Sequence, residues 1–185
     1  MPSEVDISSS ALTKLGAAPI TSFDDGTDRA NLCRDYYPNV RDAVLRAYPW
    51  NCAVQRIALA LDASAPLFGY DYKFALPTIP YCLRVLETED DVEYKIEGRF
   101  LLCDETSINI KFIARITDPG LFDSLLVEAI QARLAAELAY PITGSPTLAV
   151  EMWKLYAEKL REARGIDGQE GEADYWESNA LIEVR

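Results

Sequence analysis

The segment from Asp118 to Ala139 most restricts what this chain can fold into. Asp118 before Pro119 is a typical helix start, because an aspartate accepts from free backbone amides and proline fits the first turn. A helix that is apolar on nearly all sides must be surrounded, so we expect the central helix of a bundle, ending at Pro141. Its circumference is covered by two apolar rows, Phe122, Leu125, Ala129, Ala132 and Ala136 with Leu126, Ile130, Leu134 and Leu138.

Two more helices are predicted near the ends of the chain. An apolar stripe over residues 6–15 favours a helix that ends at Gly16. Ser145 and Pro146 repeat the start signal described above, so a last helix is expected to begin there. Since glycine commonly follows the last turn of a helix, we expect this one to stop at Gly165.

A second helix is predicted after an N-cap at Thr27 or Asp28. Pro38 lies inside it, and an interior proline removes one backbone hydrogen bond. We therefore expect a kink there, or two helical segments that meet. Asp42 and Arg46 stand four residues apart on its outer side, a spacing that predicts an ion pair along the helix.

The stretch 50–117 consists of short segments separated by proline, glycine and acidic turns, which predicts a β-rich insertion. Its clearest strand is 108–116, where alternation predicts one buried face and one mostly wet face. Glu97 and Gly98 offer a two-residue hairpin turn. Residues 56–61 could equally form a strand or a helical turn. Further strands are expected at 50–61, 70–76, 81–86, 92–96 and 99–103.

Together these elements predict an α+β fold, a helical bundle with a β-rich insertion between the second and third main helices and an extended C-terminal tail. With 185 residues, 49% of them apolar, the chain can bury a substantial core. The pattern of a secretion signal or a membrane span is not seen, so no membrane partner is expected. The predicted divisions are 1–49 and 118–165 for the bundle, 50–117 for the insertion and 166–185 for the acidic tail.

The charge of the chain argues against tight binding of nucleic acid. Thirty acidic and 18 basic residues give a formal net charge of −12, the wrong sign for neutralising phosphates. A negative wall would still let a DNA duplex slide past without adhering.

Most familiar catalytic chemistry is missing from the sequence. Without any histidine, the chain cannot form Ser–His–Asp or Cys–His sites or histidine-ligated metal centres. No glycine-rich phosphate loop is present, and we expect no catalytic residues, no metal and no cofactor. Four cysteines that lie far apart are interpreted as small buried hydrophobes, namely Cys33, Cys52, Cys82 and Cys103.

An acidic run between two predicted strands offers the one alternative to a non-enzymatic role. Glu87, Glu89, Asp90 and Asp91 could supply the paired carboxylates of a polymer hydrolase. A charge run of this kind is more typical of a solvated hairpin tip, and we favour that interpretation.

The acidic C-terminal segment carries large apolar side chains. Such a segment cannot bury a core of its own, and exposed aromatic residues are unusual in a soluble monomer. We expect Tyr175, Trp176, Leu181 and Ile182 to dock against a neighbouring subunit or partner, with disorder as the alternative.

Several phrases, taken in order, resemble one family of phage proteins. The last is Ile166-Asp167-Gly168-Gln169-Glu170-Gly171, and the others lie at 11–16, 20–27, 41–51, 76–77, 82–86, 114–119 and 143–149. In this order they resemble the head-to-tail adaptor of short-tailed bacteriophages, the tail tubular protein A or gatekeeper family. Pro38 and the segment from Ala173 onward depart from the family pattern.

The resemblance implies a structural, non-enzymatic virion protein assembled in the host cytoplasm and located in the neck. Such adaptors form a dodecameric ring between the capsid portal and the tail nozzle, and the genome passes through it during packaging and ejection. The expected partners are thus other copies of the chain, the portal protein and the nozzle protein. A virion-borne cell-wall hydrolase and a monomeric binding module are the alternatives.

Overall fold

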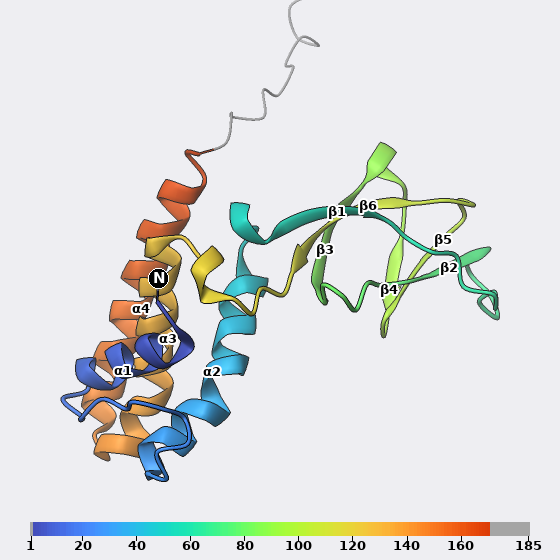
Figure 1. Ribbon diagram of the computed structural model, residues 1–185. Coiled ribbons are helices and arrows are strands. Elements are labelled where there is room, and N and C mark those ends of the chain that lie inside the picture. Colours follow the sequence, from blue (N-terminus) through green and yellow to red (C-terminus); the bar gives the residue numbers. More distant parts are fainter. Residues whose placement is uncertain (1, 171–185) are drawn as a thin grey trace, which may run out of the picture.

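Helices and sheets occupy different ends of the molecule (Figure 1). The computed structural model describes residues 2–170, and within them the chain forms four α-helices and two three-stranded antiparallel sheets. All six strands come between the second and third helices along the chain. The predicted α+β fold class is therefore confirmed.

The third helix is the centre of the helical part. It packs against the other three helices, and its apolar rows are buried from Leu126 onward, with Leu126 and Leu134 fully inaccessible to solvent. Leu125 is half-buried, and Phe122 lies before the helix begins. The prediction of a central helix is thus supported by its packing and burial. The four helices are α1 Glu4–Lys14, α2 Asp28–Ala47, α3 Ser124–Thr143 and α4 Pro146–Asp167.

The start of α3 differs from the prediction. Asp118 does accept a hydrogen bond, from the Gly120 amide at 2.8 Å, but it caps only the 3₁₀ turn Pro119–Leu121. The cap of α3 itself is Asp123, which accepts from the Leu125 amide at 2.8 Å. Two aspartates five residues apart carry the same local signal, and only the second leads into the long helix.

Both α3 and α4 continue past their predicted ends. Pro141 lies inside the last turn of α3, where the missing N–H removes a single hydrogen bond. The helix ends instead at Gly144, whose φ of +66° suits glycine and whose amide donates to Tyr140 O at 2.9 Å. Gly165 likewise lies within α4, which ends at Asp167.

The second helix forms one continuous element. Its N-cap is Thr27, whose hydroxyl accepts from the Ala30 amide at 3.2 Å, so this alternative of the prediction is correct. Pro38 lies inside α2 without dividing it into two helices. Because Pro38 and Arg34 are both exposed, the carbonyl that loses its donor lies on the water-facing side of the helix.

The two sheets form a separate core beside the bundle, and β6 contributes to both cores. Phe112 belongs to the same core as Phe74 and Leu101 of the second sheet, whereas the neighbouring Ile113 belongs to the helical core that includes Trp50. The predicted buried face is confirmed, and on the second face Asn109 is exposed while Lys111 and Arg115 are half-buried, so Ile113 is the one residue that departs from the prediction. The sheets have the strand orders β1 Val54–Ala58, β6 Asn109–Ala114, β3 Cys82–Thr88 and β2 Tyr72–Ala75, β5 Phe100–Cys103, β4 Lys95–Glu97.

Two local predictions in the insertion are now decided. Glu97 pairs with Phe100, so the hairpin turn is formed by Gly98 and Arg99 and not by the pair one position earlier. Gly98 takes a φ of +59°, which costs glycine little. Residues 56–58 belong to β1, so the alternative of a helical turn is wrong for them.

Charged side chains of α2 bind the β-rich part. Asp42 lies 2.6 Å from the Arg115 guanidinium beyond β6 and 2.9 Å from that of Arg41. Arg46 donates to the Leu83 carbonyl on β3. The predicted ion pair between Asp42 and Arg46 is wrong, because both side chains are engaged by groups that only the tertiary structure brings near.

Candidate assembly surfaces

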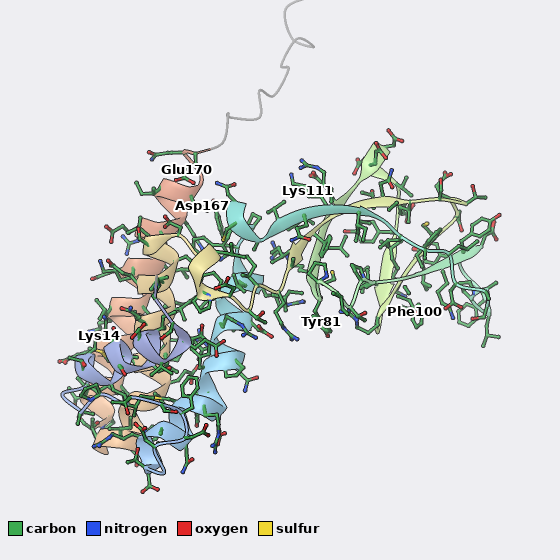
Figure 2. The ribbon with its side chains drawn as sticks, in the orientation of Figure 1. Lys14, Tyr81, Phe100, Lys111, Asp167 and Glu170 are labelled. Atoms are coloured by element: carbon green, nitrogen blue, oxygen red, sulfur yellow. The ribbon has the colours of Figure 1, made fainter. Side chains whose placement is uncertain are left out.

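The four residues predicted to form an assembly interface lie outside the described part of the chain. They are Tyr175, Trp176, Leu181 and Ile182, whereas the description ends at Glu170. The structure does describe the residues that precede this segment, Asp167 to Glu170 at the end of α4 (Figure 2).

Asp167 anchors that end of α4. Its carboxylate accepts from the Asn51 amide at 3.1 and 3.3 Å, and its backbone carbonyl accepts from Asn51 Nδ2 at 2.6 Å. One turn earlier, the Arg164 carbonyl accepts from the Tyr48 hydroxyl at 3.3 Å. These bonds explain why α4 passes through Gly165. They also hold the start of the C-terminal segment against the junction of helices and sheets.

Because Asp167 is buried, the effect of its carboxyl on the free energy of folding depends on pH. Only 8% of the residue is exposed, and desolvation raises the pKa of its carboxyl above the ordinary value, outweighing the hydrogen bond from Asn51. The carboxyl is neutral in both states below the unfolded-state pKa. As the pH rises through the folded-state pKa, the buried charge makes folding less favourable.

Asp167→Asn is therefore expected to gain stability relative to the wild type as the pH rises from about 3 to 7. Asparagine keeps an oxygen acceptor for the Asn51 amide and cannot ionise. Thermal unfolding over that pH series measures the difference, with Glu158→Gln, an exposed carboxyl on the same helix, as the control for the same chemical change. A difference in melting temperature that stays constant or falls with pH would contradict the prediction.

The loop between β1 and β2 presents two large apolar side chains to solvent. Leu67 is 99% exposed and Phe68 is 87% exposed, and we call residues 62–71 the tip loop. Its base is held, because the Asp62 amide donates to the Lys73 carbonyl at 2.8 Å and the two side chains lie 3.5 Å apart. Figure 1 shows this loop at the end of the β-rich part farthest from the helices.

A hollow of about 330 Å³ adjoins the tip loop and is lined by five of its residues together with side chains of β2, β4 and β5. The Lys73 ammonium lies 4.5 Å from the centre of the Phe100 ring. Hydrogen bonds from Ser64, with the nearby Lys73 charge, hold the pKa of Asp62 below its usual value. The loop thus offers an apolar contact on a defined base.

The acidic residues at and just after the end of β3 are exposed, and two of them have partners within the described residues. Glu87 lies 2.9 Å from the Lys111 ammonium, and Glu89 accepts from the Asn109 side chain. Both line a hollow of about 390 Å³ beside β1 and β6. A general acid usually needs apolar surroundings, which these exposed carboxylates do not have, so the geometry offers no acid–base pair of the usual kind.

The cysteines behave as apolar side chains. All four are free, and three are buried; burial raises the pKa of the Cys33 and Cys52 thiols to about 11. Within residues 2–170, no cluster of three potential metal ligands occurs. In the same range, no helix has the length and apolarity needed to cross a membrane.

No protein-family model and no curated protein sequence matches this chain.

Proposed function

We propose that this protein is a structural subunit of a phage virion, a head-to-tail adaptor that forms a ring between the portal and the tail nozzle. The ordered resemblance over residues 7–171 supports this family assignment. The observation that carries the proposal is the tip loop, which exposes Leu67 and Phe68 at the end of the molecule opposite the helices.

A ring requires every subunit to have two different complementary surfaces, because its contacts are heterologous. Large adjacent apolar side chains that are fully exposed are typical of such contacts. Burying each would contribute about 1.5–3 kcal/mol, so the tip loop is a natural contact with a neighbouring subunit or with the nozzle. The genome would pass a wall that carries the net charge of −12 and does not bind DNA tightly.

Native mass spectrometry tests the proposal directly. We expect a species near twelve times the 20.7 kDa mass of the chain, in isolation or once the portal is added. A protein that stays monomeric in both conditions would support the monomeric binding module instead.

The double substitution Leu67→Ser and Phe68→Ser is expected to weaken assembly or nozzle binding by at least about tenfold, because it removes the apolar area of the tip loop. The melting temperature should stay close to that of the wild type, since neither side chain contributes to a core. Val150→Ser, at a residue that is 55% exposed on α4, is the control. Assembly that is unchanged in the double variant, or equally weakened in the control, would contradict a role of the tip loop.

A further inference from the structure

A second surface concentrates positive charge in a chain that is otherwise acidic. A groove of about 460 Å³ lies between α2, β3 and the β4–β5 turn, and four arginines line it. We call it the arginine groove. Among the described residues that line it there is no carboxylate. Its arginines are Arg46, Arg84, Arg99 and Arg115.

Two of these guanidinium groups are stacked on one ring. The guanidinium carbons of Arg99 and Arg115 lie 4.1 and 4.2 Å from the centre of the Tyr81 ring. Tyr81, which immediately precedes β3, is labelled in Figure 2. Arg99 also donates to the carbonyls of Cys82 and Pro77 at 2.8 and 2.7 Å. The cations are therefore held in place before any ligand arrives, which lowers the entropy cost of binding.

Most of this positive charge is not neutralised by any residue that the structure describes. Arg46 and Arg99 donate to backbone carbonyls, which carry no net charge. Arg84 forms no ion pair with any described residue, and Arg115 shares Asp42 with Arg41. The Nε of Arg115 is buried without an acceptor. The groove thus fits a ligand that brings carboxylates.

The walls between the arginines are apolar, and this further restricts the chemical class of ligand that fits the groove. Leu76, Val85 and Ile96 line the same groove, and Ile96 is partly exposed. A matching ligand has carboxylates beside large apolar side chains. Residues 172–177 have this composition, with three carboxylates around two aromatic rings in the order Glu-Ala-Asp-Tyr-Trp-Glu.

We propose that the arginine groove receives residues 172–177 of a neighbouring copy of this chain, an inference that rests on the proposed ring. The carboxylates bind the guanidinium groups, and Tyr175 and Trp176 contact the apolar walls. The last described residue before this segment is Glu170, and Figure 2 shows it well separated from Tyr81. A contact between copies is therefore favoured, and it supplies the two different surfaces that a ring needs.

Charge reversal in full-length chains tests this contact. The groove variant is Arg84→Glu, and the segment variant carries Glu172→Lys, Asp174→Lys and Glu177→Lys. Each alone is expected to assemble at least about tenfold more weakly than the wild type, because like charges then meet. Arg161→Glu, an exposed change of the same charge on α4, should assemble normally.

Mixing the two variants identifies which copy supplies the segment. The groove variant retains an intact segment and the segment variant an intact groove, so the mixture should form pairs in native mass spectrometry that neither variant forms alone. No pair formation from the mixture, with normal folding of both variants, would overturn docking between copies.

A synthetic peptide of residues 170–185 tests the groove independently of ring formation. It should bind the segment variant, and Arg84→Ala in that background should weaken binding at least about tenfold. Replacing the carboxylates of the peptide by amides should have a similar effect. If the peptide does not bind although the wild-type chain forms a normal ring, the groove proposal alone is overturned. Peptide binding by a chain that never forms a ring would support the groove and overturn the proposed ring. Tighter binding of duplex DNA than of peptide would overturn the assignment of the ligand.

Discussion

Replacing Leu134 by alanine is expected to lower the free energy of unfolding by about 2–5 kcal/mol. Leu134 is fully buried in α3, which packs against all three other helices. The truncation removes apolar contacts and leaves a cavity that the surrounding helices cannot close without moving. Urea unfolding measured by circular dichroism gives the difference.

Leu121→Ala provides the matched control, because this leucine is 62% exposed just before α3. Its loss should change stability by no more than about 0.5 kcal/mol. If Leu134→Ala costs less than about 1 kcal/mol, α3 does not have the central structural role that its burial indicates.

The sequence predicted the elements whose signals are local and repeated. The apolar rows of α3 follow from helical periodicity, and the caps Thr27 and Ser145 follow from side chains that accept backbone amides. These features depend on residues within one or two turns of each other. They could therefore be found without knowledge of the tertiary structure.

The errors arose where distant parts of the chain override a local signal. Gly165 is a plausible helix stop, yet α4 continues because Asp167 binds Asn51, more than a hundred residues earlier. Ile113 alternates with the apolar face of β6, yet it is buried because the bundle covers that side. Periodicity describes one face of one element and does not reveal a second core behind it.

The two candidate surfaces also differ in how far the sequence alone indicates them. Leu67 and Phe68 lie between a proline and a glycine, so adjacent large apolar residues in a predicted loop were a usable signal that the sequence interpretation missed. The arginine groove has no such signal in the sequence, because Arg46, Arg84 and Arg99 are far apart in the chain and only the topology brings them together.

Asp42→Ala should destabilise the protein by about 2–3 kcal/mol, because it leaves a buried arginine without its closest partner. The Arg41 side chain is 8% exposed and lies 2.9 Å from Asp42. The same carboxylate binds Arg115 at 2.6 Å and so connects α2 to the β-rich part. Asp42 and Arg115 are partly solvated, which keeps the expected loss below that of a fully buried ion pair.

The control for Asp42→Ala is Asp35→Ala on the same helix, whose carboxylate is 69% exposed and lies 3.7 Å from the adjacent Arg34. Removing this exposed carboxylate should change stability by no more than about 0.5 kcal/mol. Denaturant unfolding followed by both circular dichroism and tryptophan fluorescence measures the two variants. Because Trp50 lies in the same core as Ile113 of β6, a weakened junction should also alter its fluorescence before the helices unfold. Equal losses in the two variants would show that the ion pairs of Asp42 do not hold the helical and β-rich parts together.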